Sequence, residues 1–185
     1  MRNTEELTKN FVSSFLGRDD YEVTSIFNKL NWRKADLGNW EQSKTVWKEA
    51  TGYLILKDFL KDFQWNEDTV TQKQGVDFTS FKKRYDLKAL VGNYHNENNQ
   101  LCITIELEQY KKQTLTADKL TDVLAYTVVE DGEYTVVLIP YKKLIKWLNK
   151  HKDSYKKYTS NNGSGLYIKV PVNDLDFAST FIRGW

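Results

Sequence analysis

Three carboxylates on two short predicted strands are the residues of this chain best suited to metal-dependent chemistry. Asp86 belongs to a stretch of alternating apolar and polar residues at 84–91, and Glu106 and Glu108 belong to a second stretch at 101–108. Alternation of this kind is typical of a half-buried β-strand, with one face toward the core and one toward solvent. In both stretches the carboxylates fall on the polar face.

A polar loop joins the two predicted strands and indicates a hairpin. The segment 93–99 is rich in turn-forming residues. When the hairpin is centred on Asn96, Asp86 lies directly opposite Glu106, and Glu108 follows on the same face. Facing residues have Cβ atoms about 4.5–5.5 Å apart, and like charges in such positions destabilise a sheet. A divalent cation would neutralise the cluster, so we expect these carboxylates to bind one.

The composition favours one globular domain in a reducing compartment. The chain has 185 residues, 40% of them hydrophobic and 14% aromatic, which is enough for a substantial core. Its net charge is only +2, so nucleic-acid binding would depend on where the charges lie. Cys102 is the only cysteine, which excludes an intramolecular disulfide and a Cys-rich zinc site. No apolar signal segment or membrane-spanning stretch is present, so we expect a soluble, cytoplasmic protein without membrane contact.

Hydrophobic spacing predicts a helical extension over 1–40, a mixed core over 41–139, and a basic helix with a final strand over 140–185. Helices are expected at 4–16, 22–31, 41–63, 116–126 and 141–158. Strands are expected at 69–78, with a bulge near Gly75, in the hairpin, at 134–139 and at 166–170. The core elements therefore follow one another in the order αβββαβ.

This order of elements resembles the PD-(D/E)xK nucleases, the restriction-endonuclease-like superfamily. Its members carry an acid on the second core strand and Glu-x-Lys on the third. Asp86 and Glu106 match the two acids, and Glu108 stands where the lysine is expected, as in restriction enzymes that end the motif in Glu-x-Glu. The resemblance implies an α/β (α+β) fold with a mixed central sheet and Mg²⁺-dependent hydrolysis of phosphodiester bonds, most often in DNA.

The resemblance also implies roles for residues around the acidic pair. Glu49, on the preceding helix, matches an additional acid that could hold a second metal, and the main-chain carbonyl of Leu107 matches a third metal ligand. Glu108 would orient the attacking water, unless the amine of a displaced lysine (Lys111, Lys112 or Lys119) serves as the base. Asp77 is the second choice for the strand-two acid because of its Gly-x-Asp context.

Three groups of basic residues are expected to surround these acids. They are Lys82, Lys83 and Arg84, then Lys111 and Lys112, and then the lysine-rich helix with Lys142, Lys143 and Lys146. Lysines grouped in this way can follow a phosphate backbone and release its counterions. Solvated lysines on a surface helix are the alternative interpretation.

We therefore expect a metal-dependent endonuclease acting on DNA. By analogy with the family, a homodimer would cut both strands with one site per chain. One structural alternative is an exposed hairpin whose charges pair locally, with Arg84 opposite Glu108, and with Glu49 a solvated helix-face residue. The alternative functions are a nuclease-like fold that only binds nucleic acid and an accessory interaction protein.

Overall fold

The computed structural model describes residues 6, 8, 40–66, 68–116, 118–130, 132–160 and 163–184. Its helices are α3 (Trp40–Phe59), α4 (Thr69–Lys73) and α5 (Tyr141–His151), with 3₁₀ turns η1 (Lys152–Ser154) and η2 (Val172–Asp174). Its strands are β1 (Gln64–Trp65), β2 (Phe78–Ser80), β3 (Lys83–Val91), β4 (Cys102–Gln109), β5 (Lys112–Gln113), β6 (Val123–Val129), β7 (Glu133–Pro140), β8 (Lys157–Thr159), β9 (Gly165–Pro171) and β10 (Ser179–Gly184).

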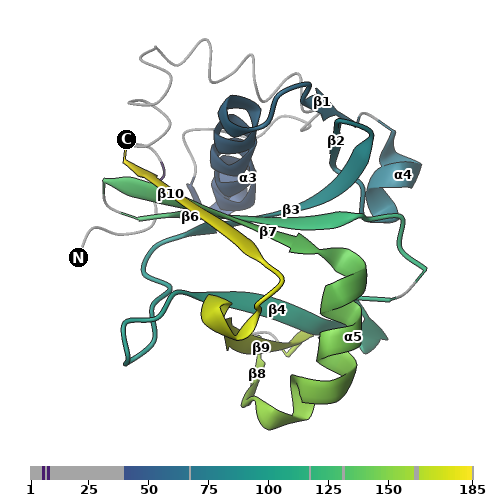
Figure 1. Ribbon diagram of the computed structural model, residues 1–185, viewed down its shortest axis with the longest axis vertical. Helices are drawn as coiled ribbons and strands as arrows, with labels where there is room; N and C mark the ends of the chain where they lie inside the picture. The colour runs from purple at the N-terminus through teal and green to yellow at the C-terminus, as the bar shows by residue number, and fades with distance from the viewer. Residues whose placement is uncertain are drawn as a thin grey trace.

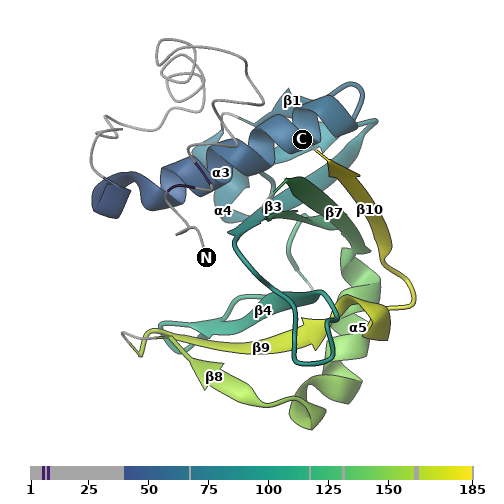
Figure 2. The ribbon, with the colours of Figure 1, turned by 90° about the vertical axis from the view of Figure 1, so that its left-hand side faces the viewer.

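These strands form two sheets (Figures 1 and 2). The larger has the order β1-β2-β3-β6-β7-β10, and the smaller has the order β5-β4-β9-β8. Strands β3 and β6 run parallel, whereas the other neighbours among the described strands run antiparallel. The predicted mixed α/β class with a mixed central sheet is therefore confirmed.

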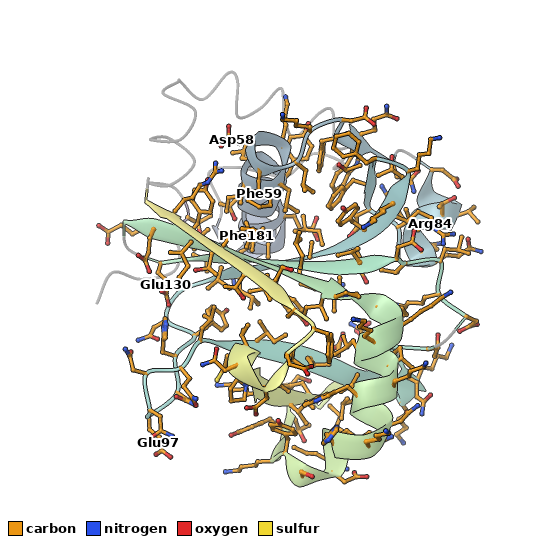
Figure 3. All side chains as sticks on the ribbon, in the orientation of Figure 1. Asp58, Phe59, Arg84, Glu97, Glu130 and Phe181 are labelled. Carbon is orange, nitrogen blue, oxygen red and sulfur yellow. The ribbon has the colours of Figure 1, made fainter. Side chains whose placement is uncertain are left out.

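The alternating pattern of β3 separates a core face from a polar face. Tyr85, Leu87 and Val91 are buried in an apolar cluster with side chains of α3, such as Leu54. Helix α3 therefore covers one face of the larger sheet. Asp86 and Lys88 of β3 point to the other face. At one edge of this sheet, Phe59 of α3 contacts Phe181 of β10, with ring centroids 4.8 Å apart (Figure 3).

A second apolar cluster joins the smaller sheet to the rest of the molecule. Ile103 and Ile105 of β4 pack with Ile139 of β7 and with Leu144 and Leu148 of α5. Helix α5 buries only a narrow apolar stripe, and most of its lysines remain exposed. Figure 2 shows β4, β9 and β8 lying side by side beneath the larger sheet.

The predicted hairpin between the two acidic strands is wrong. Strand β3 has β2 on one side and β6 on the other, whereas β4 pairs with β5 and β9 in the smaller sheet. The chain leaves β3 at Gly92, whose φ of 122° suits glycine, and the loop that follows leads to the other sheet. Both edges of β3 are thus occupied, which leaves β4 no position beside it.

Two other segments differ from their predicted structures. Residues 69–73 form helix α4 because Asp68 caps it by accepting hydrogen bonds from the amides of Val70 and Thr71. The predicted helix at 116–126 is absent, and residues 123–129 form β6, which is buried almost throughout. A short apolar run buried on both faces does not reveal by its period whether it is helix or strand.

The remaining predicted elements fare better. Helix 41–63 corresponds to α3, strand 134–139 to β7, and strand 166–170 to β9. The lysine-rich helix ends at His151 rather than at 158, and β10 was not predicted. The predicted helices at 4–16 and 22–31 lie outside the described residues, apart from Glu6 and Thr8, which are helical. Within the described part of the chain, none of the helices has the length and apolar character needed to cross a membrane.

Candidate functional site

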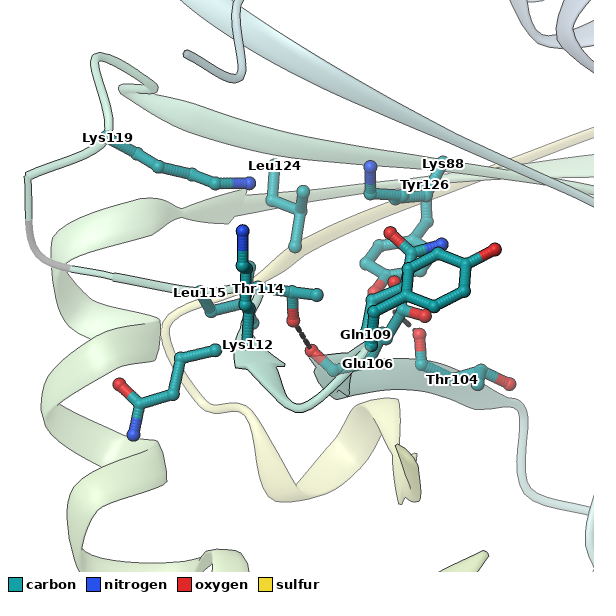
Figure 4. Close-up of a pocket in the computed structure, with 12 residues that line it drawn as sticks. Lys88, Thr104, Glu106, Gln109, Lys112, Thr114, Leu115, Lys119, Leu124 and Tyr126 are labelled. Carbon is teal, nitrogen blue, oxygen red and sulfur yellow. Dashed lines mark hydrogen bonds between the residues drawn. The ribbon is translucent and has the colours of Figure 1, made fainter. Parts of the chain in front are cut away.

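A cavity of about 480 Å³ lies between the two sheets (Figure 4). Its walls include Lys88 of β3, Tyr126 of β6, Glu106 of β4, Lys112 of β5 and Lys119 from the segment before β6. Figure 4 shows these side chains converging on one space from both sheets. We call this space the inter-sheet cleft.

Asp77 and Asp86 lie behind the part of the cleft wall that Lys88 of β3 forms. Asp86 is only 3% exposed, and its side chain points to the cleft side of the larger sheet. Asp77, one residue before β2, accepts a hydrogen bond of 2.7 Å from the main-chain amide of Leu87. The Asp77 carboxyl also lies close enough to Asp86 for the charge of Asp86 to act on it. Two acids are thus held together by the antiparallel β2–β3 pairing.

Two lysines neutralise this pair from the cleft. The ammonium group of Lys88 lies 2.7 Å from Oδ1 of Asp86, and that of Lys119 lies 3.8 Å from its Oδ2. The Lys88 side chain keeps 45% of its surface exposed, so a ligand in the cleft can reach it. Lys88 and Lys119 thus line the cleft and contact Asp86, which lies behind them.

Burial and mutual charge shift the ionisation of these groups. Burial, followed by the charge of Asp86, raises the pKa of Asp77 to about 6. Burial alone would lower the pKa of Lys88, but the negative charges of Asp86, Asp77 and Glu106 outweigh it and raise that pKa. Lys88 therefore stays charged, and Asp77 holds a proton more readily than an exposed carboxyl.

The structure brings Glu106 to the same site as Asp86, but from the opposite wall. Glu106 lines the cleft from the smaller sheet, where its charge acts on Lys88 and on Tyr126. The Tyr126 hydroxyl bridges the two sheets by donating a hydrogen bond of 2.8 Å to the carbonyl oxygen of Thr104. The predicted association of these two acids thus arises from sheet packing and not from strand pairing.

The prediction that Glu108 shares a face with Glu106 is wrong. The pairing of β4 with β9 shifts register between these two glutamates, which marks a β-bulge. Glu108 lines a separate cavity of about 210 Å³, together with residues of α5 and β9. Leu107 lines that cavity too, and its carbonyl oxygen accepts a hydrogen bond of 3.1 Å from the amide of Thr114. Neither residue faces Asp86.

Glu49 lies apart from the cleft. It is half-buried on α3, which packs on the face of β3 that carries Leu87 and not on the face that carries Asp86. Gly52, one helical turn later, approaches the sheet so closely that an added Cβ would lie 2.9 Å from Leu87. The sheet therefore separates this part of α3 from the proposed acidic pair.

The predicted basic clusters are only partly gathered at the cleft. Arg84 makes two hydrogen bonds of 2.9 Å to the carboxylate of Asp122. The other members are distributed as follows: Lys82 and Lys83 are exposed at the β2–β3 turn, Lys111 is exposed at the β4–β5 turn, Lys112 lines the cleft, and Lys142, Lys143 and Lys146 lie on the exposed face of α5. Of the displaced lysines considered as the base, Lys119 reaches Asp86.

Sequence reasoning missed Lys88 as a functional residue and ranked Asp77 too low. The signal was present as Asp86-Leu87-Lys88, an Asp-x-Lys triplet that follows the Gly-x-Asp ending at Asp77 by nine residues. The assumed hairpin hid this signal because it assigned the third core strand to 101–108.

The donor set at the acidic pair suits a hard divalent cation. No cluster of three or more His, Cys, Asp and Glu side chains placed to hold a metal occurs in the described part of the chain. Mg²⁺, however, commonly binds through one or two carboxylates and completes its shell with water and substrate phosphates. Asp77 and Asp86, as two adjoining carboxyl groups, meet that requirement.

Comparison with known proteins adds no relative. No protein-family model matches this chain, and neither a curated protein nor a solved structure matches it.

Proposed function

We propose that this chain is a metal-dependent endonuclease with its reaction centre at Asp77, Asp86 and Lys88. One observation carries the proposal. An acid directly before the second strand of an antiparallel β1–β2–β3 unit meets an Asp-x-Lys triplet on the third strand, and the lysine of this triplet lines the inter-sheet cleft. This arrangement resembles the PD-(D/E)xK pattern more closely than the Glu106–Glu108 assignment does.

The order of elements supports the same assignment. Helix α3 precedes β1, β2 and β3, and β6 lies beside β3 in parallel. Segment 92–122, which contains β4 and β5, occupies the place in the chain where the αβββαβ order has a helix. The proposed core is therefore α3-β1-β2-β3-β6, and the smaller sheet is an addition that forms the second wall of the cleft.

Asp77 and Asp86 would hold Mg²⁺ or Mn²⁺. A bound cation supplies an acidic water and neutralises charge that develops on the phosphate. Asp77 must lose its proton before both carboxylates can act as ligands, because a protonated carboxyl binds a cation poorly. The pKa of about 6 at Asp77 therefore predicts weak metal binding below that pH.

The three cleft lysines would bind the phosphates. Lys88, held at 2.7 Å from Asp86, is placed to donate hydrogen bonds to a phosphate oxygen beside the acidic pair. Lys112 and Lys119 line the same cleft and add positive charge along it. Glu106 raises the pKa of Lys88 and so helps to keep it in the ammonium form.

A protein that binds nucleic acid without cutting it is the second candidate. It is favoured by the contacts of Lys88 and Lys119 with Asp86, which already neutralise the carboxylate without a metal. This candidate predicts nucleic-acid affinity that does not increase when divalent cations are added.

Cleavage assays distinguish the two candidates. Supercoiled plasmid and single-stranded DNA would be incubated with Mg²⁺, Mn²⁺ or EDTA. We expect metal-dependent cutting by the wild-type chain and a loss of at least about 100-fold in Asp77→Asn, Asp86→Asn and Lys88→Met, because each removes a metal ligand or a phosphate contact. Glu133→Gln, at an exposed position at the start of β7, serves as the control and should cut like the wild type.

Glu108→Gln decides between the two site assignments. If this variant loses activity and Asp77→Asn does not, the Glu-x-Glu assignment is right and the one proposed here is wrong. If no substrate is cut with any metal, although the protein binds DNA in EDTA, the binding protein replaces the nuclease.

A further inference from the structure

One face of the smaller sheet carries an ordered set of aromatic and basic side chains. Glu106 of β4 pairs with Tyr167 of β9, and Tyr167 pairs with Tyr158 of β8. Thr104 pairs with Lys169 in the same way. Directly paired residues of antiparallel strands project from the same face, so these side chains form two adjacent rows.

The two tyrosine rings stack against each other. The rings of Tyr158 and Tyr167 are nearly parallel, with an angle of 16° between their planes and 5.6 Å between their centroids. Both rings are half-buried, which leaves part of each one accessible. We call Tyr158 and Tyr167 the tyrosine platform.

Two lysines accompany the platform. The ammonium groups of Lys156 and Lys169 lie 5.3 Å and 5.6 Å from the centroid of the Tyr158 ring. Both lysine side chains are exposed. Cross-strand aromatic pairing alone would stabilise the sheet. Two cations beside a half-exposed ring also make a site that attracts an anionic, aromatic ligand.

The platform is continuous with the inter-sheet cleft. Thr104 and Glu106 belong to the platform rows and also line the cleft. From Tyr158, the rows lead across β9 and β4 to the cleft, where Lys112 and Lys119 continue the positive charge. Glu106 is the one acid in the two rows, and Lys88 opposes its charge from across the cleft.

We propose that the tyrosine platform binds unpaired bases of single-stranded DNA and directs the strand into the inter-sheet cleft. This inference rests on the proposed function, since the strand would be the substrate of that site. Bases can stack on tyrosine rings only when they are not paired within a duplex, and the phosphates between them would lie against Lys156 and Lys169. The platform therefore favours a single strand, or the unpaired part of a branched substrate, over intact duplex.

The test measures binding separately from cleavage. Fluorescence anisotropy of a labelled oligo-dT and of a duplex of equal length would be recorded in EDTA, where a metal-dependent enzyme cannot cut. For the single strand, we expect Tyr158→Ala and Tyr167→Ala each to raise the Kd about tenfold, because stacking on a tyrosine is lost. Duplex affinity should change less than about twofold, and Tyr158→Phe and Tyr167→Phe should bind like the wild type because phenylalanine still stacks.

The lysines have a matched control within the chain. Lys57 of α3 also lies beside a tyrosine, 5.9 Å from the Tyr53 centroid, but on the helix that covers the opposite side of the larger sheet. Lys156→Gln and Lys169→Gln should weaken single-strand binding and reduce its salt dependence, whereas Lys57→Gln should do neither. Circular dichroism and thermal melting would verify that each variant is folded.

Three results would overturn the inference: no binding of oligo-dT by the wild type, equal losses for duplex and single strand in the alanine variants, or affinity for RNA in place of DNA. Failure of the proposed function is a different result. A chain that binds oligo-dT through the platform but cuts nothing with Mn²⁺ would retain this inference and lose the nuclease.

Discussion

At the scale of single residues, the carboxyl pair of Asp77 and Asp86 combines burial with the repulsion of like charges. Asp86 is buried and Asp77 is half-buried, and among the described contacts only Asp86 has lysines within salt-bridge distance. Burial and the neighbouring charge raise the pKa of Asp77 to about 6, so the folded chain holds a proton that the unfolded chain releases near pH 4. A raised carboxyl pKa of this kind is typical of groups gathered at a functional site.

Asp77→Asn should therefore stabilise the metal-free protein above pH 6. Because the folded pKa is raised, the contribution of Asp77 to stability is intact below about pH 4, declines as the pH rises to about 6, and is lost above it. The amide retains an oxygen that can accept the hydrogen bond from Leu87. Urea unfolding at several pH values should show a gain of about 1–2 kcal/mol at pH 7.5 and little change at pH 4.

The pH dependence separates this effect from general repacking. Glu97→Gln, at an exposed position in the β3–β4 loop, is the control and should leave the stability curve unchanged. A gain of equal size at pH 4 and pH 7.5 would show that the ionisation of Asp77 is not its cause.

At the scale of elements, helix α3 and strand β3 determine which face of the sheet is available for chemistry. The helix packs so closely on one face that a Cβ at Gly52 would lie 2.9 Å from Leu87 Cδ1 and from Thr127 Oγ1. This contact seals the apolar face, so Asp86 of β3 faces the smaller sheet. The close approach depends on a residue without a side chain.

Gly52→Val should loosen this packing and lower the free energy of unfolding by about 1–3 kcal/mol. The branched side chain would overlap with Leu87 and Thr127, which are both buried. Chemical denaturation measures the loss. Lys57→Val, at an exposed position on the same helix, is the matched control and should cost only the difference in helix propensity, about 0.5 kcal/mol. Equal losses in both variants would mean that the close contact contributes nothing.

At the scale of the whole molecule, the cleft lies between two sheets that contact each other at only some points. A shared apolar cluster joins them on the side of α5, and the hydrogen bond from Tyr126 to Thr104 joins them at the cleft. The tyrosine hydroxyl spans from β6 to the main chain of β4, so it couples the wall that carries the acids to the wall that carries the platform.

Tyr126→Phe should remove this link at a cost of about 0.5–1.5 kcal/mol, because the Thr104 carbonyl loses a buried donor. The free energy of unfolding in urea gives the size of the loss. Tyr158→Phe, on the platform, is the matched substitution and should change stability by less than about 0.5 kcal/mol. If the two variants are equally stable, the bridge between the sheets contributes no stability.

The sequence by itself determined the local features of this protein. The alternation in β3 and β4 predicted which side chains face the core, and the uninterrupted apolar run at 134–139 predicted a buried strand, which β7 confirms. These features depend on the side chains of neighbouring residues, which any chain segment carries with it. These local features are enough to predict the α/β class and to predict that acids and lysines lie near Asp86.

Only the tertiary structure decided which strands pair and hence which residues meet. The choice between β4 and β6 as the neighbour of β3 depends on how whole apolar faces are buried, and alternation does not record that choice. A single β-bulge then turned Glu108 away from Glu106. The alternation of apolar and polar residues does not indicate where such a bulge occurs. The pairing of β2 with β3 placed Asp77 beside Asp86, and the packing of the two sheets brought Glu106 to the opposite wall of the cleft, because such contacts depend on how the whole chain buries its apolar faces.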